Sequence, residues 1–256
     1  MTVPLYIVSL PRSTERRELM RSELERLGLS ATFVDGITPD ELTPEQIARY
    51  DRKRALGIYG LDLLPSEKAC IMAHERALRT ALADGHDCAV ILEDDIRLDD
   101  TFPAVLACLG GPDAPLRDRW DVIRLDTSRK SSVPRAAARS RTRADLPGGR
   151  TLYRLDTHVL GAMGYLVTRE GIRKILAFQD RYFMPFDQMM DRFWENGIDP
   201  FVVLPPVLSH RDELSSDVGE RSLDRHKTAS RWTRWRRRVN RWKDSVGKRL
   251  HRLRHP

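Results

Sequence analysis

Cysteine is scarce in this chain, which has only three in 256 residues, Cys70, Cys88 and Cys108. All three lie in apolar stretches, and their spacing lacks the close pairs typical of zinc sites and disulfide-stapled domains. The sequence therefore argues against both a disulfide framework and a zinc site, and it predicts reduced, buried thiols in a cytosolic protein.

Long apolar runs are also missing. No stretch approaches the roughly 20 apolar residues that a membrane-spanning helix requires. The run from Val3 to Leu10 has no basic region before it and no small-residue cleavage site after it. We therefore interpret this run as a buried strand and not as a signal peptide.

Acidic residues are nearly absent from the C-terminal segment. Residues 231–256 contain eleven Lys or Arg and one acid, Asp244, a net charge of +10 in a chain whose total is +7. The other 230 residues are thus mildly acidic, at −3. We divide the chain into a body, residues 1–226, and a basic tail rich in Trp and Arg, residues 227–256.

Strand and helix patterns alternate along the body. Apolar runs predict strands at 3–10, 31–36, 88–92, 121–125, 152–155, 164–168 and 201–204, and helical spacing predicts helices at 14–27, 66–83, 101–109, 169–178 and 186–196. Short helices and loops are expected over 37–65, and a basic mobile loop or lid over 127–150. This alternation indicates an α/β fold with a mostly parallel sheet covered on both faces.

Three consecutive carboxylates, Glu93, Asp94 and Asp95, follow the clearest central strand. Like charges this close repel one another unless a cation compensates them. Side chains alternate along a strand, so we expect Glu93 and Asp95 to project together and Asp94 away. Their hard oxygens suit Mg²⁺ or Mn²⁺, which stabilises a departing diphosphate. A solvated acidic loop is the alternative.

Several segments resemble glycosyltransferase family 25, which includes lipooligosaccharide and collagen galactosyltransferases. In chain order, the segments that carry the resemblance are 7–17 (IVSLPRSTERR), 33–36 (FVDG), 67–74 (EKACIMAH), 92–95 (LEDD), 161–167 (GAMGYLV) and 185–187 (PFD). The resemblance spans roughly residues 3–223. The chain departs from the family pattern at Pro11, Ala69 and Ala73, and Ala73 removes a hydroxyl beside His74.

The resemblance implies a GT-A-like fold, a nucleotide-sugar donor and transfer with inversion at the anomeric carbon. Inversion requires one base on the acceptor hydroxyl; Asp187, after Pro185, is our candidate and Asp191 its substitute. Helix capping is the ordinary role of an Asp at Asp187's position. The expected metal ligands are Asp95, Glu93 and His210.

The donor nucleotide is expected to contact residues near the first strands and the acidic cluster. These candidates are Arg12, Arg16, Asp35, Glu93 and Asp94. We expect Arg17 and Arg21 to lie on a solvated helix face. We expect His74, which lies on an apolar helix face, to be a packed histidine.

In the tail, apolar residues recur at helical spacing between Arg and Lys. They are Trp232, Trp235, Val239, Trp242, Val246, Leu250 and Leu253. Such an amphipathic C-terminal helix is typical of an anchor at an anionic membrane surface. The alternatives are packing on the body and nonspecific nucleic-acid binding; we expect no specific nucleic-acid partner.

The sequence thus predicts a cytoplasmic glycosyltransferase, peripheral on the inner face of the membrane. The resemblance to the family implies that galactose from UDP-galactose is moved to a lipopolysaccharide-like or other surface-glycan acceptor, with Mn²⁺ or Mg²⁺ as the cation. A metal-dependent nucleotidyltransferase is an alternative, although no Gly-rich phosphate loop followed by Lys supports it. A non-catalytic adaptor at the membrane surface is another alternative.

Overall fold

The structure is a computed structural model that describes residues 3–155, 157–211, 240 and 244–251. Its strands are β1 (Leu5–Ser9), β2 (Thr32–Asp35), β3 (Cys88–Glu93), β4 (Ile96–Leu98), β5 (Val122–Arg124), β6 (Arg143–Leu146), β7 (Arg150–Arg154), β8 (Gly164–Thr168), β9 (Pro200–Leu204) and β10 (Leu208–His210). Eight of them form one sheet in the order β2-β1-β3-β8-β5-β9-β7-β6, and β4 pairs with β10 in a small second sheet.

The large sheet is mostly parallel in strand direction. Within it, β1 is parallel to β2 and β3, and β5 is parallel to β9. Only β8 and β7 run opposite to the other six strands, because each is antiparallel to both of its neighbours. The carboxyl ends of β1, β2, β3, β5 and β9 therefore share one edge of the sheet, as the predicted α/β fold requires.

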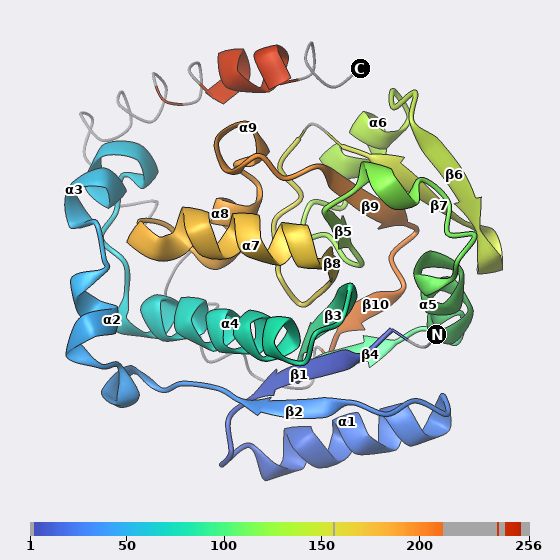
Figure 1. Ribbon diagram of the computed structural model, residues 1–256, viewed down its shortest axis with the longest axis horizontal. Helices are drawn as coiled ribbons and strands as arrows, with labels where there is room; N and C mark the ends of the chain where they lie inside the picture. The colour runs from blue at the N-terminus through green and yellow to red at the C-terminus, as the bar shows by residue number, and fades with distance from the viewer. Residues whose placement is uncertain (1–2, 156, 212–239, 241–243, 252–256) are drawn as a thin grey trace.

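Helices cover both faces of this sheet (Figure 1). The α-helices are α1 (Thr14–Arg26), α2 (Pro44–Ala48), α3 (Arg52–Arg54), α4 (Pro65–Ala83), α5 (Phe102–Gly110), α6 (Ser132–Ala137), α7 (Arg169–Phe178), α8 (Phe186–Met190) and α9 (Phe193–Asn196). Short η segments lie at Pro39–Glu41, Ala55–Tyr59, Arg117–Arg119, Pro147–Gly149 and Gln179–Arg181. Layers of this kind are consistent with a GT-A-like fold.

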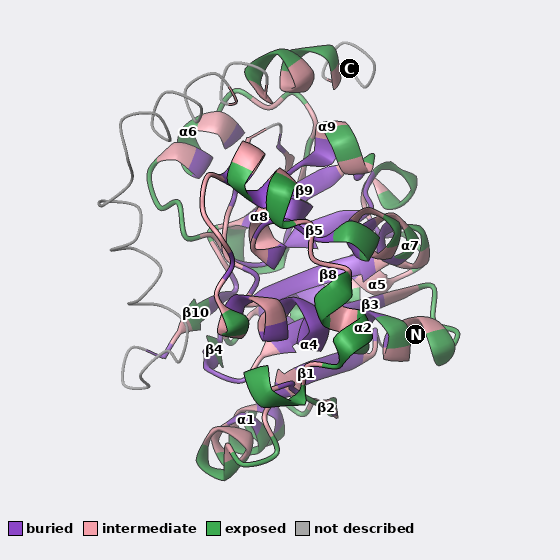
Figure 2. Cartoon of the chain, turned by 90° about the vertical axis from the view of Figure 1, so that its left-hand side faces the viewer, coloured by how far each residue is buried: buried purple, intermediate pink, exposed green. Residues whose placement is uncertain are grey.

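Strand alternation assigns each buried side chain to one of two cores. In β3, Ala89 and Ile91 pack in the core that contains α4, α7 and α8, whereas Val90 and Leu92 pack in the core with α1 and α5. Every strand residue with this period faces one layer or the other. Because helices cover both faces of the sheet, its central strands are buried, whereas the outer sides of the helices are exposed (Figure 2).

Two predicted segments differ from the structure. The interval 127–150 is not a continuous loop, because it contains α6 and β6, and β6 pairs with β7 at the sheet edge. The helix predicted over 186–196 is divided into α8 and α9, with Asp191 and Arg192 between them. The strands β4 and β10 were not predicted.

The cysteines are free, as predicted, but they are only partly buried and not fully enclosed. No helix among the described residues meets the length and apolarity needed to cross a membrane. Of the predicted tail stripe, Trp232, Trp235, Val239, Trp242 and Leu253 lie outside the described residues. Residues 244–251 are helical.

Candidate active site at the carboxyl edge of the sheet

The acidic cluster lies where β3 ends. Glu93 continues the face of Ala89 and Ile91, which packs toward α4, and its Oε1 meets His74 Nε2 at 3.2 Å. His74 is buried and stacks on the Phe186 ring at 4.3 Å, so the prediction of a packed histidine is confirmed. Its ring nitrogens nevertheless both face polar groups, which that prediction did not include.

Asp94 points toward α1, on the other side of the sheet. Its Oδ2 accepts a 2.6 Å hydrogen bond from Ser9 Oγ, and its Oδ1 lies 3.2 Å from Arg16 Nη1. The same Arg16 nitrogen lies 3.9 Å from Asp95. Asp94 thus points away from Glu93 as expected, but the chain bends after Glu93 and both aspartates share Arg16. Arg16 supplies part of the positive charge that three adjacent carboxylates need.

Asp95 is buried with one oxygen unpaired. Its Oδ2 lies 3.3 Å from His210 Nε2, whereas Oδ1 has no hydrogen-bond partner among the described residues. His210 reaches this place because β10 pairs with β4, which sets His210 opposite Ile96. Burial, and next the charge of Glu93, raise the pKa of Asp95 to about 6.

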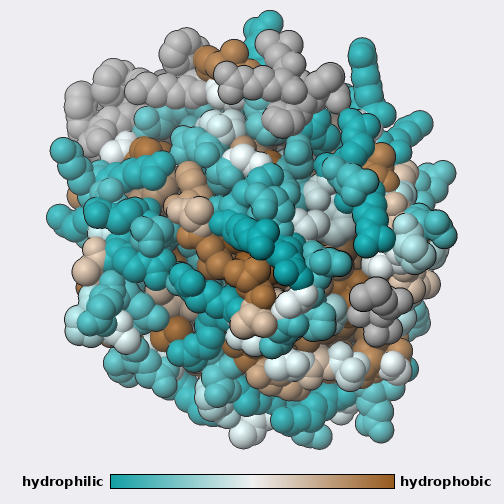
Figure 3. Space-filling view, viewed as in Figure 1, coloured by the Kyte–Doolittle hydropathy of each residue, from teal (hydrophilic) through white to brown (hydrophobic). Residues whose placement is uncertain are grey.

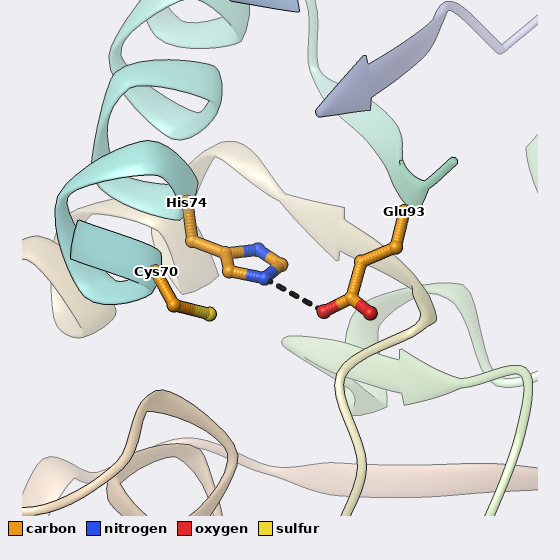
Figure 4. Close-up of side chains that lie close together, drawn as sticks. All are labelled: Cys70, His74 and Glu93. Carbon is orange, nitrogen blue, oxygen red and sulfur yellow. Dashed lines mark hydrogen bonds and ion pairs between the residues drawn. The ribbon is translucent and has the colours of Figure 1, made fainter. Parts of the chain in front are cut away.

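The predicted ligand trio does not assemble as one group. Asp95 and His210 come together, but Glu93 is turned to His74. Within the described part of the chain, the three potential ligands that lie within 4.8 Å of one another are Cys70, His74 and Glu93 (Figure 4). Cys70 and His74 share a face of α4 because they are four residues apart, but no sequence signal linked them to Glu93.

Asp187 lies half-buried at the start of α8. Its Oδ2 accepts from the Gly161 backbone N–H at 3.0 Å, and its Oδ1 accepts from that of Gln188 at 2.8 Å. Burial raises the pKa of the Cys70 thiol, and the nearby negative charges of Glu93, Asp187 and Asp95 raise it further. The fold therefore brings Asp187 to the acidic cluster, far away in sequence.

Asp191 is fully enclosed. Its Oδ2 accepts from the N–H groups of Val159 and Leu160 at 2.9 and 2.8 Å, and Arg124 lies 3.8 Å from its Oδ1. Burial raises the pKa of Asp191 to about 6 and lowers that of the neighbouring His158 to about 3, so His158 is neutral there. These contacts hold the 159–160 backbone and leave Asp191 5% exposed.

Sequence reasoning missed Asp126, which follows β5 as Glu93 follows the apolar part of β3. It is 1% exposed, and neither carboxylate oxygen has a hydrogen-bond partner among the described residues. Burial raises its pKa to about 7, Arg124 lowers it, and Glu93 and Asp187 raise it further. An acid directly after a buried apolar run was the available signal.

The remaining nucleotide candidates lie around the ends of β1 and β2. Arg12 is exposed, and Asp35 has a side chain that is 58% exposed. Arg17 binds Asp35 at 2.6 Å and donates to the Ser9 carbonyl, so its assignment to a solvated helix face was wrong. Arg21 does lie on such a face, with more than half of its side chain exposed.

The fold and this edge of carboxylates are consistent with a GT-A-like class of transferase. Residues 2–190 match the model of glycosyltransferase family 25 (LPS biosynthesis protein), and the chain belongs to this family.

Three relatives illustrate the range of the family. The lacto-N-neotetraose biosynthesis glycosyltransferase LgtB of Neisseria gonorrhoeae is 27% identical over 82% of this chain and 64% of its own length. The probable inactive glycosyltransferase 25 family member 3 of Rattus norvegicus is 24% identical over 80% of this chain and 37% of its own. Procollagen galactosyltransferase 1-B of Xenopus laevis is 24% identical over 67% of this chain and 28% of its own. The chain thus spans less than two thirds of the length of each of these three relatives.

Proposed function

We propose that this chain transfers a hexose, galactose from UDP-galactose, to a lipopolysaccharide-like or other surface-glycan acceptor with inversion. Family membership and the relative that makes lacto-N-neotetraose support the transferase and the class of acceptor. The observation that carries the proposal is Asp95, a buried carboxylate with one oxygen unpaired and a histidine beside the other.

Asp95 and His210 fit a divalent cation. A buried oxygen without a partner is costly unless a ligand occupies it, and a carboxylate suits Mn²⁺ or Mg²⁺. When bound, the cation would stabilise negative charge on the leaving diphosphate. Glu93 remains a candidate for contact with the donor. Arg12 and Asp35 remain candidates for contact with the nucleotide, and their exposure is compatible with that role.

Arg16 and Asp94 act together in this proposal. Asp94 is held by Ser9 and in turn fixes Arg16, whose guanidinium also approaches Asp95. A guanidinium fixed in this way donates to phosphate oxygens without a large loss of side-chain entropy. Asp94 therefore positions a phosphate-binding group.

Asp187 is the proposed base. It takes the proton of the acceptor hydroxyl as that oxygen bonds to the anomeric carbon, while the bond from that carbon to the diphosphate breaks on the opposite face. Each of its oxygens accepts one backbone N–H and keeps a further lone pair that can accept the proton. Asp191, the substitute candidate, is more deeply buried than Asp187 and accepts two backbone N–H groups on one oxygen, so we prefer Asp187.

The test is calorimetric titration of UDP and UDP-sugars into wild type and Asp95→Asn, with Mn²⁺ and with EDTA. We expect Mn²⁺-dependent UDP binding that weakens about 100-fold in Asp95→Asn, because a metal ligand is lost. Asp113→Asn, at an exposed carboxylate, is the matched control. Unaltered UDP binding in Asp95→Asn, or none in folded wild type, would refute the site.

Release of UDP on addition of acceptor then separates an enzyme from a non-catalytic adaptor, the alternative that the inactive relative favours. The transferase predicts turnover in wild type that is lost in Asp95→Asn. UDP binding without turnover on any glycan acceptor would favour the adaptor.

We also propose that the tail binds an anionic membrane surface. The helical residues 244–251 contact the body through their polar side, since Asp244 pairs with Arg192 and Lys248 lies over Trp194. On the other side Val246 and Leu250 are exposed by 41% and 52%. A small apolar group is visible at the top of the molecule, where the red helical segment lies (Figures 1 and 3). An apolar stripe turned outward among basic residues suits a lipid interface.

Sedimentation with vesicles tests this placement. We expect wild type to bind vesicles that contain anionic lipid, and Val246→Asp/Leu250→Asp to bind several-fold less, because each charge must enter the interface. Ile47→Asp, at an exposed apolar residue of α2, is the matched control. Equal binding of all three proteins would contradict the proposal.

A further inference from the structure

A second group of potential ligands lies beside the acidic cluster. Cys70 and His74 come from α4 and Glu93 from the end of β3, and one ligand atom of each lies within 4.8 Å of the others. In Figure 4 the thiol, the imidazole and the carboxylate converge on one point between helix and strand. Cys70 is partly buried, and His74 fully.

The local structure explains this convergence. Residues four apart on a helix share a face, so Cys70 and His74 project from α4 in the same direction. That face packs on the sheet surface formed by Ala89 and Ile91, and Glu93 is the next residue with the same alternation. The regular geometry of the helix and the strand thus holds three potential metal ligands of different chemistry near one another.

The imidazole is held as metal-bound imidazoles are. His74 Nδ1 lies 3.3 Å from the Tyr165 hydroxyl, and Phe186 stacks on the ring with an interplanar angle of 6°. Tyr165 can accept from Nδ1–H, which leaves the Nε2 lone pair directed at Glu93 and Cys70. A partner on the second nitrogen that sets the tautomer is a regular feature of metal sites.

We propose that Cys70, His74 and Glu93 form a Zn²⁺ site with three protein ligands and a fourth position open. Thiolate, imidazole and carboxylate together select zinc over the hard cations that suit Asp95. Atoms bound to one Zn²⁺ at about 2.0–2.3 Å lie within about 4 Å of one another, so a small inward movement completes the set.

The charges around the site favour a cation. Glu67, Asp187 and Asp95 add negative charge around the Cys70 thiol. On binding, the Cys70 S–H bond is replaced by a sulfur–zinc bond, and the proton passes to solvent. Nothing in this step depends on sugar transfer, but the site assigns Glu93 to zinc in place of contact with the sugar donor.

Cobalt(II) provides a spectroscopic test on the full-length, metal-stripped protein. We expect Co²⁺ to give a sulfur-to-cobalt charge-transfer band in the near ultraviolet, and Zn²⁺ to displace it. Cys70→Ser should lose the band and weaken Zn²⁺ binding by about tenfold or more, whereas Cys108→Ser, a partly buried cysteine in α5, should keep both. Circular dichroism confirms that each variant is folded.

Two results would overturn the site. One is folded wild type that binds no Co²⁺ or binds it without the sulfur band. The other is loss of the band in Asp95→Asn, which would place the metal at Asp95. If the site is correct, Asp95→Asn keeps the band while losing Mn²⁺-dependent UDP binding, so failure of either proposal is distinguishable from failure of the other.

Discussion

The end of β3 and the end of α8 both bury an aspartate whose pKa is about 6, yet the two carboxylates differ in how they are held. Asp191 accepts two backbone N–H groups and is 5% exposed. Asp95 is 7% exposed, meets His210 on one oxygen and has no partner on the other.

This difference teaches that burial and a raised pKa do not by themselves mark a functional carboxylate. Desolvation raises both pKa values, so the distinguishing feature is the state of the oxygen atoms. At α8, backbone N–H groups of residues 159–161 donate hydrogen bonds to Asp191 and Asp187. These bonds hold the 159–161 loop in place. At the end of β3, side chains hold Asp94 and Asp95, and one oxygen of Asp95 has no partner among the described residues.

The largest expected effect tests whether α8 is only structural. Asp187→Asn should lower kcat by about 1000-fold, because the amide cannot take the acceptor proton. Its carbonyl oxygen can still accept from the Gly161 N–H, so the thermal midpoint should change little. Turnover and thermal unfolding are measured side by side.

Asp180→Asn, at a side chain that is 74% exposed, is the control for Asp187→Asn. Normal turnover in Asp187→Asn would show that Asp187 takes no part in the reaction. Asp187 and Asp191 would then both serve only to hold the 159–161 loop.

The next effect concerns the pH dependence of folding stability at Asp191. Its pKa is about 6 when folded and 3.8 ordinarily, so between these values the folded state retains a proton that the unfolded state has lost. Stability from this group is therefore present at low pH and lost as pH rises through this window. Asp191→Asn cannot lose a proton, and by about pH 7 it should exceed wild type by about 3 kcal/mol.

Urea unfolding at about pH 4 and about pH 7 measures this difference. Asp191→Ala in the same series should fall below Asp191→Asn by about 2 kcal/mol at both pH values, because the N–H groups of Val159 and Leu160 lose their acceptor. A difference between Asp191→Asn and wild type that is independent of pH would contradict the assignment.

Most of the fold could be predicted because the periodic spacing of apolar residues determines where the strands and helices form. The runs before Ser9 and Glu93 are apolar on both faces, as buried parallel strands require, and these became β1 and β3. β4 and β10 are three residues each, too short for a periodic signal. The segment containing β6 reads as a loop because the strand is four residues long, two of them charged, and it follows a stretch rich in Arg and Ser; in the fold it pairs with β7.

The candidate site was only partly accessible from sequence. The strand end suggested Glu93 and Asp95 as candidates, and of the expected ligand trio the structure brings His210 within 3.3 Å of Asp95. The direction of each carboxylate depended on the bend after Glu93, which no periodicity encodes. The contact of Glu93 with His74 and the unpaired oxygens of Asp126 depend on tertiary packing.

The smallest effect tests whether the β3 end depends on single side-chain donors. Ser9→Ala removes the 2.6 Å hydrogen bond to Asp94 but leaves Arg16 in place. We expect a loss of about 1 kcal/mol in unfolding free energy, the usual worth of one such bond. Mn²⁺-dependent UDP affinity should fall only a few-fold, because Asp94 acts through Arg16 and not on the ligand. Urea unfolding and calorimetry measure the two effects, with Ser22→Ala, at an exposed serine of α1, as the control. A loss of UDP binding as large as that in Asp95→Asn would show that Asp94 contacts the ligand directly. Asp94 would then be a binding residue and not one that acts only through Arg16.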